Sequence, residues 1–471
     1  MERNCGPMNA LGGSFILFFA FLCGYAEAQQ PRGSNIPSDL IGSVSQGTPS
    51  GGVIPLSIGD AIDRALKYNL GYVIGEQETR VSTAARVRSL SELLPKVNAG
   101  ISEAIQQINL ASFGFRGFPG VPPVVGPFSV FDTRARYTQA VFDSRLAHEL
   151  RAASERVAAS NYALQDVREL IALITTDLYL DAVAESSRVD AARAQLRTAQ
   201  AVYDRARDLK DSGLIPGIDV LRAQVQLQAQ QQRLVTVENE LAKQKLRLAR
   251  AIGLPQGQEF AQTDAFMNAP PNTPALAEAL RIALDSRSDY RRAMTLVRAA
   301  EETRKAALGR RLPSLQVNAD YGDIGRTPAN SHGTMLLQGT LSIPIYTGQR
   351  VRAEVLESDA LLEQRKAEVS NLRDQIEYEI RTANLDIRSA ADQLQVAQAG
   401  KDLARQQLEQ AQDRFAAGVA NGLEVTQAQE AVVTADENYI SALYALNTAQ
   451  AALARATGNA EKTIKSFLGA K

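Results

Sequence analysis

The stretch SGLIPGIDVLRAQVQLQ, residues 212–228, has a near-copy in AGVANGLEVTQAQEAVV, residues 417–433. Gly213 aligns with Gly418, and Gly217 aligns with Gly422 at the same offset. That offset also aligns LARAIG with LARATG further along each copy. A constant offset over such a length indicates an internal duplication.

The duplication continues toward the N-terminus with a larger offset. DAIDRAL, beginning at Asp60, matches EALRIAL, beginning at Glu278, and Pro95 matches Pro313 at this larger offset. Because the offset is smaller at the first turn than at Pro95, the first copy carries about thirteen extra residues in that interval. We expect these extra residues to form a loop.

The chain of 471 residues therefore divides into two similar repeats. We expect the first repeat over residues 56–255 and the second over 278–458, with a linker over 256–277 and a C-terminal tail over 459–471. Residues 29–55 are rich in Pro, Gly, Ser and Gln and show no periodicity, which predicts a disordered or loosely held leader. No role is assigned to the tail.

Residues 1–28 predict a secretory signal peptide. LGGSFILFFAFLCG forms an apolar core, and AEA supplies small residues before a cut after Ala28. A membrane-spanning helix takes roughly twenty apolar residues, which is longer than this core. Both cysteines, Cys5 and Cys23, lie in this segment, so the mature chain contains none. A lipid anchor on Cys23 is the alternative, and Met8 is an alternative start.

Two very long helices are predicted. From Phe128 to Ser212 there is neither proline nor glycine, and from Ile345 onward there is no proline. A helix from Asp143 to Lys210 would hold 68 residues and span about 100 Å. Shorter helical segments of 35 residues flank the long helices, at 60–94, 218–252, 278–312 and 423–457. Two short segments placed end to end match one long helix, so each repeat can form two helical columns.

A seam of apolar residues repeats every 3.5 residues along both long helices, which is the period of a coiled coil. In the second repeat the seam consists of Ile376, Ile380, Ala383, Ile387, Ala390, Leu394, Ala397, Ala404, Leu408, Ala411 and Phe415, with Lys401 intruding. In the first repeat it consists of Leu178, Ala182, Val189, Ala192, Leu196, Ala199, Tyr203 and Ala206, with Glu185 intruding. By periodicity alone, a plain soluble coiled coil fits equally well.

Between the helices, each repeat carries a pair of strand-like segments. They cover residues 96–108 and 129–142 in the first repeat and 314–325 and 334–346 in the second. Alternating apolar and polar side chains suit a wall between lipid and water, and spanning strands need roughly 9 to 11 residues. Spanning barrels begin at about eight strands, so four strands predict that several copies of the chain share one barrel.

The sequence has a signal peptide, and each of its two repeats has the order helix, hairpin, long helix, glycine turn and helix, with strands that start at LPKVNA and LPSLQVNA. In these features it resembles the TolC-like outer-membrane efflux proteins over about residues 56–458. The resemblance implies a mainly α fold with inserted β strands. It implies a homotrimer that forms a 12-stranded β-barrel in the outer membrane of a Gram-negative bacterium, continuous with an α-helical tunnel through the periplasm. It also implies an adaptor (membrane fusion) protein and an inner-membrane pump, in a tripartite efflux or type I secretion system with passive passage through the channel.

In that family the turn after each long helix lies at the periplasmic tip, where the adaptor docks. The corresponding docking candidates are Gly213, Leu214, Gly217, Gly418, Val419 and Gly422. The four glycines have a second interpretation as helix-ending and turn residues. Both roles can hold at once.

Three residues near the turns are candidates for a periplasmic gate. The family member best known for gating carries two acids after the second turn; Glu424 matches the first position, and Gln427 departs at the second. Asp219 is the repeat-related acid of the first turn. A ring of such acids would favour cations. Alternatively, Asp219 and Glu424 only occupy a first helical turn, where a carboxylate stabilises the helix by about 0.3 to 1 kcal/mol.

Other functional classes find little support. His148 and His332 lie in dissimilar settings, and neither a phosphate-binding loop nor a nucleophile motif is present, so we expect no enzyme, no cofactor and no metal site. A net charge of −1 gives no reason to expect nucleic acid. The alternative to a channel is a periplasmic structural or adaptor coiled coil whose hairpins are small soluble sheets. The sequence does not identify the transported substrate.

Overall fold

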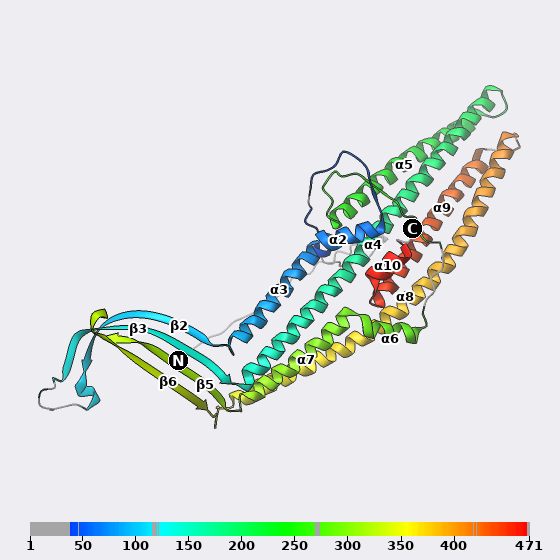
Figure 1. Cartoon of the computed structure of the whole chain (residues 1–471). Coiled ribbons are helices and arrows are strands. Elements are labelled where there is room, and N and C mark those ends of the chain that lie inside the picture. Colours follow the sequence, from blue (N-terminus) through cyan, green and yellow to red (C-terminus); the bar gives the residue numbers. More distant parts are fainter. Residues whose placement is uncertain are drawn as a thin grey trace, which may run out of the picture. The chain divides into compact units, whose positions relative to one another are not determined.

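The computed structural model describes residues 38–45, 47–114, 120, 122–268, 274–417, 419–420 and 422–468. The predicted signal peptide lies outside the described residues. The first repeat contains α2 (Ile58–Tyr68), α3 (Leu70–Ser91), β2 (Lys96–Asn109), η1 (Leu110–Phe113), β3 (Val124–Phe142), α4 (Ser144–Asp211) and α5 (Gly217–Ala251). The second contains α6 (Leu276–Ser286), α7 (Ser288–Gly309), β5 (Ser314–Gly325), η2 (Pro328–Asn330), β6 (Ser331–Ser342), α8 (Arg350–Ala416) and α9 (Gly422–Ala456). Both repeats therefore have the predicted order of helix, hairpin, long helix and helix (Figure 1).

The two hairpins form one antiparallel sheet in the order β2-β3-β5-β6. Its register places Ala135 opposite both Ala99 and Tyr321. β3 begins earlier than the predicted 129, and β6 ends at Ser342 instead of running to 346. The next segment contains Pro344, which has no N–H to donate to a strand ladder. The connection after β2 is the longer of the two hairpin connections, as expected for the insertion in the first repeat.

The predicted long helices are present as α4, with 68 residues, and α8, with 67. Their seams are confirmed, because most of the predicted seam residues are buried. The intruding Lys401 lies with its Nζ 3.6 Å from Asp436 and 4.1 Å from the centre of the Tyr439 ring. The intruding Glu185 pairs with Arg188 at 2.7 Å. No helix in the described part of the chain combines the length and the hydrophobicity that crossing a membrane takes.

The short helical column of each repeat is broken at a place that the sequence did not predict. The segments expected as continuous over 60–94 and 278–312 are interrupted at Asn69 and at Arg287. The buried Asn69 accepts a hydrogen bond from the Gly71 N–H at 2.8 Å and so caps α3. The buried Arg287 pairs with Asp289 at 2.6 Å and also with Glu379. The prediction failed because neither break contains glycine or proline.

The expectation of a loosely held leader is wrong for the described residues between 38 and 55. They include α1 (Ser38–Ile41), with Leu40 buried, and the start of β1 (Ile54–Leu56). β1 pairs in parallel with β4 (Phe260–Gln262) of the linker. The Ser50 N–H donates to the Gln258 side chain at 2.7 Å. These backbone and side-chain bonds hold the segment without any apolar periodicity in its sequence.

The tail also folds against the repeats. It forms α10 (Ala460–Leu468), in which Ala460 and Ile464 are fully buried. Glu461 pairs with Arg168 of α4 at 3.0 Å, and Lys465 pairs with Asp63 of α2 at 2.5 Å. The tail therefore links the end of the second repeat to the first.

The helices lie in a row whose order matches the sheet. Next to the sheet the order is α3, α4, α7, α8, and these helices are continuous in the chain with β2, β3, β5 and β6 respectively. Toward the turns the order is α5, α4, α9, α8 (Figure 1). Sheet and helices therefore each have two outer members, and α8 and β6 lie on the same side.

Candidate functional site

The first turn is closed by Gly213. α4 ends at Asp211, and Gly213 follows with a φ of +72°, in the left-handed region that L side chains rarely adopt. The Gly213 N–H donates to the Lys210 carbonyl at 2.8 Å, and the Leu214 N–H donates to the Leu209 carbonyl at 2.9 Å. This pairing of terminal carbonyls is typical of a glycine-ended helix. The backbone interpretation of Gly213 is therefore confirmed, whereas Gly217 starts α5 without a positive φ.

The second turn follows the same plan. The Val419 and Ala420 N–H groups donate to the Arg414 carbonyl at 3.0 and 3.2 Å. Gly418, predicted as the closing glycine, lies outside the described residues. Gly422 is buried at the start of α9, and a Cβ built on it would lie 3.5 Å from the Asp219 carboxylate oxygen. The two turns of one chain are therefore in contact.

Both turns are anchored by one apolar cluster, which we call the tip cluster. It consists of Ala206 and Leu209 from α4, Ala223 from α5, Ala411 and Phe415 from α8, and Val425 and Ala428 from α9. Ile215 of the first turn packs against it. Because all four helices contribute, the ends of the two repeats form one packed unit.

The two repeat-related acids have different surroundings. Asp219 is 6% exposed and pairs with Arg222 at 3.1 Å. The Glu424 side chain is 43% exposed and pairs with the Arg414 Nε at 3.2 Å. Gln427 is exposed one turn further along α9. Of the two acids, Glu424 alone lies toward solvent, and its role in a gate stays a prediction.

The surface of the tip includes exposed apolar side chains. Leu214 and Val419, the predicted contact residues, are 68% and 72% exposed. Ile218 and Leu423 are also exposed, at 50% and 47%, and the sequence reasoning did not select them as contacts. They stand at equivalent positions of the two repeats, directly after Gly217 and Gly422, so the duplication itself could have identified them.

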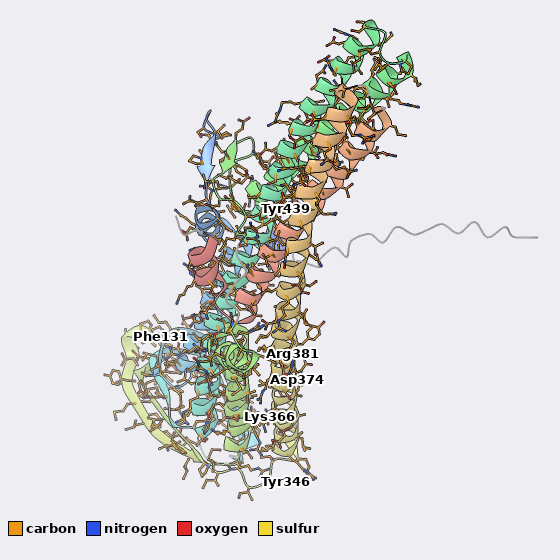
Figure 2. The ribbon with its side chains drawn as sticks, turned by 90° about the vertical axis from the view of Figure 1, so that its right-hand side faces the viewer. Phe131, Tyr346, Lys366, Asp374, Arg381 and Tyr439 are labelled. Carbon is orange, nitrogen blue, oxygen red and sulfur yellow. The ribbon has the colours of Figure 1, made fainter. Side chains whose placement is uncertain are left out.

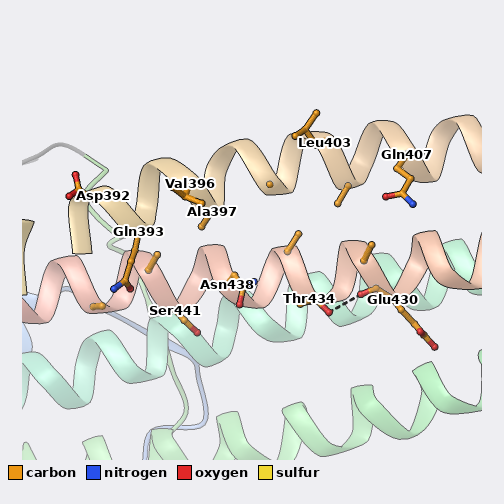
Figure 3. Close-up of a pocket in the computed structure, with 16 residues that line it drawn as sticks. Asp392, Gln393, Val396, Ala397, Leu403, Gln407, Glu430, Thr434, Asn438 and Ser441 are labelled. Carbon is orange, nitrogen blue, oxygen red and sulfur yellow. Dashed lines mark hydrogen bonds between the residues drawn. The ribbon is translucent and has the colours of Figure 1, made fainter. Parts of the chain in front are cut away.

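A groove of about 1180 Å³ runs between α8 and α9, next to the tip cluster (Figure 3). Small residues leave this space, because a Cβ atom built on Gly400 would meet no atom within 4 Å. Val396 and Leu403 of α8 beside it are 74% and 65% exposed. The seam residues Ala397 and Ala404 line this groove, which the sequence did not predict.

Nearer the middle of the helices, the carboxyl group of Asp177 forms no ion pair with any other residue that the structure describes. Burial, with a smaller contribution from Asp181, raises the pKa of Asp177 to about 7. Burial, followed by Asp181 and Asp177, raises the pKa of Tyr444 to about 12. Asp177 and Tyr444 line a cavity of about 470 Å³ together with Asp386. The sequence reasoning missed this cluster, because its members come from three helices.

A model of the family described as outer membrane efflux protein matches residues 78–254 and 279–459. The chain belongs to this family. The two matched segments correspond to the two repeats, which confirms the resemblance. Family membership places the protein in the outer membrane, with its helices extending into the periplasm.

Individual outer membrane efflux relatives agree with this assignment. The pyoverdine export outer membrane protein OpmQ of Pseudomonas putida is 25% identical over 310 residues, which span 64% of this chain and 64% of that protein. The outer-membrane channel OprN has a TM-score of 0.73 at 18% identity, over 85% of this chain and 90% of that chain. The Campylobacter jejuni CmeC outer membrane channel has a TM-score of 0.75 at 15% identity, over 90% of this chain and 92% of that chain. The structural relatives are channels and not enzymes, and they share the fold of this chain.

Proposed function

We propose that three copies of this chain form an outer-membrane channel for passive efflux, with the helices as a tunnel through the periplasm. The tunnel receives its substrates from an inner-membrane pump, to which an adaptor protein connects it. The supporting observation is that the sheet and the row of helices are open at the same two edges.

Among the described strands, the two outer strands of the sheet have one unpaired edge each. β3 and β5 have a neighbour on both sides, whereas β2 and β6 each have one neighbour within the described part of this chain. β2 and β6 carry exposed apolar side chains, among them Ile101 and Leu337 at 77% and 72%. Pairing of β6 with β2 of the next copy would satisfy both edges. Three copies would bring twelve strands, which is within the range of spanning barrels.

The outer helices of the row present matching apolar faces. The large apolar residues exposed on α5 are Ile218, Leu221, Val225, Val235 and Leu246. Those exposed on α8 are Leu356, Tyr378, Leu385, Val396 and Leu403. Contact between α5 of one copy and α8 of the next would cover both faces. The proposed pairing of β6 with β2 would bring the same two copies together.

The tip is the proposed docking surface for the adaptor. Leu214 and Val419, with Ile218 and Leu423 beside them, expose an apolar surface at the end of the helices that lies opposite the sheet (Figure 1). Gly213 and Gly217 add no side chain to that exposed end, whereas the buried Gly422 allows the two turns to pack together. Glu424 of each copy would then supply a negative charge close to the tunnel entrance.

Single-channel recording in a planar bilayer tests this function. The purified mature protein should give discrete openings that prefer cations. Glu424→Gln should lower the cation-to-anion permeability ratio by about twofold, because it removes the half-exposed charge of every copy. Asp219→Asn is the matched control, because Asp219 is buried and paired, and it should leave the ratio unchanged.

Two results would count against the proposal. Absence of openings, with the protein remaining in the aqueous phase, would contradict the proposed channel function. Equal permeability ratios in the wild type, Glu424→Gln and Asp219→Asn would agree with a channel but contradict a role of Glu424 in ion selectivity. Glu424 would then only stabilise the first turn of α9.

A further inference from the structure

The place where the second hairpin joins its helices encloses a small polar cavity. The connections 310–313, between α7 and β5, and 343–349, between β6 and α8, both contribute to it. Its volume is about 230 Å³, and its lining includes Arg145, Arg310 and Arg350 against one acid, Asp143. Pockets for whole small ligands measure roughly 300 to 1,000 Å³, so this cavity suits a fragment such as a phosphate headgroup.

Arg310 and Arg350 line this cavity, and Arg311 and Arg352 lie close to them in the chain; we call these four residues the arginine corner. The Nε atoms of Arg310 and Arg350 approach the same carboxylate, that of Glu354, at 2.6 and 3.0 Å. One carboxylate therefore serves two guanidinium groups. Arg311 and Arg352 are exposed, and neither forms an ion pair with another described residue. The corner thus carries excess positive charge.

Only one of the four arginines aligns with an arginine in the first repeat. Arg350 aligns with Arg145, which itself lines the cavity. The other three arginines align with residues that carry no positive charge, namely Glu92 for Arg310, Leu93 for Arg311 and Ala147 for Arg352. The repeat fold therefore does not require those three arginines, and they call for an explanation particular to this corner.

An apolar segment adjoins the arginine corner. Ile343, Ile345 and Tyr346 are 58%, 96% and 81% exposed. Figure 2 shows Tyr346 at the end of the helices next to the sheet. In a membrane-inserted sheet this end lies at the level of the lipid headgroups, where tyrosine is enriched and arginine attracts anionic lipid.

We propose that the arginine corner binds the phosphate headgroup of an anionic phospholipid in the periplasmic leaflet, whose acyl chains cover Ile343, Ile345 and Tyr346. Guanidinium groups suit this role, because they contact phosphate oxygens through two parallel N–H bonds. The inference rests on the proposed function, since only an inserted sheet brings this junction to the headgroups.

Native mass spectrometry of the detergent-purified mature protein tests the proposal, with phosphatidylglycerol as the titrated lipid. The double variant Arg310→Gln/Arg350→Gln should raise its Kd about tenfold or more, since two charge-assisted contacts are lost. The control Arg365→Gln/Arg381→Gln removes two paired arginines elsewhere on α8 and should leave the Kd unchanged. Wild-type affinity in the arginine-corner variant would overturn the proposal.

A second variant guards against misfolding. Arg311→Gln/Arg352→Gln alters the two exposed arginines of the corner and should weaken lipid binding about threefold with unchanged helical circular dichroism. Displacement of the lipid by millimolar inorganic phosphate would indicate a free-phosphate site and would also overturn the proposal. Fractionation of the same cells separates the two hypotheses: absence of the protein from the outer membrane contradicts the proposed function, whatever the lipid affinity.

Discussion

At the scale of single residues, Asp219 and Glu424 show how duplication allows equivalent positions to diverge. Asp219 lies against Gly422 of the other turn and pairs with Arg222, so it belongs to the packing of the tip. Glu424 is half-exposed and pairs with Arg414. A charge that faces water remains available to ions, whereas a buried and paired charge mainly affects stability.

Asp177 makes stability depend on pH. Its pKa is about 7 in the folded chain, against an ordinary value of 3.8, because burial and Asp181 disfavour the carboxylate. An acid with a raised pKa stabilises the fold fully below pH 4, and this contribution is lost as the pH rises to about 7. The free energy of unfolding of Asp177→Asn should therefore equal that of the wild type at pH 4 and exceed it by about 2 to 4 kcal/mol at pH 8.

Urea titration of the helical circular dichroism signal at both pH values measures this difference. Asp190→Asn, an exposed position on the same helix, is the control and should leave the free energy of unfolding unchanged at both pH values. A constant difference between Asp177→Asn and the wild type across the pH range would contradict the account.

At the scale of elements, the breaks at Asn69 and Arg287 divide both short columns at equivalent positions of the two repeats. Asn69 makes its break by capping α3, whereas Arg287 makes its break by a buried set of ion pairs. Arg287 also donates to the Ala456 carbonyl at the end of α9, at 3.3 Å. The second break therefore joins α7, α8 and α9.

Arg287→Met should be strongly destabilising. Removing a buried cation leaves Asp289 and Glu379 without their partner, which costs about 3 to 5 kcal/mol. Arg291→Met, one turn along α7 and exposed, should cost less than about 1 kcal/mol. The free energy of unfolding from urea titration compares the two, and equal values would refute the structural role of Arg287.

The elements differ in how far the residue pattern could predict them. The seams, α4 and the strand β5 follow from periodicities of 3.5 and 2, which depend only on neighbouring positions in the sequence. The breaks, the β1–β4 pairing and the placement of α10 depend on partners far along the chain, such as Asn69 with Leu40 and Glu461 with Arg168. The helix-ending role of Gly213 was predictable, whereas the burial of Asp219 depends on contact between the two turns.

At the scale of the whole molecule, sheet and helices present the same two open edges. β2 and α5 lie at one edge, and β6 and α8 lie at the other. Both edges carry exposed apolar side chains, which further copies of the chain would cover in the proposed trimer. The central claim is that copies complete one another by pairing β6 with β2.

Cysteine crosslinking tests that claim most directly, because both cysteines of the sequence, Cys5 and Cys23, lie in the signal peptide that we predict to be removed. Ile101→Cys on β2 and Leu337→Cys on β6 should together give covalent dimers and trimers with a short bifunctional maleimide in outer membranes. Each single variant should remain monomeric, since like strands do not meet in a closed ring. A double variant whose cysteines react with a single-headed maleimide but yield no trimer would contradict the account.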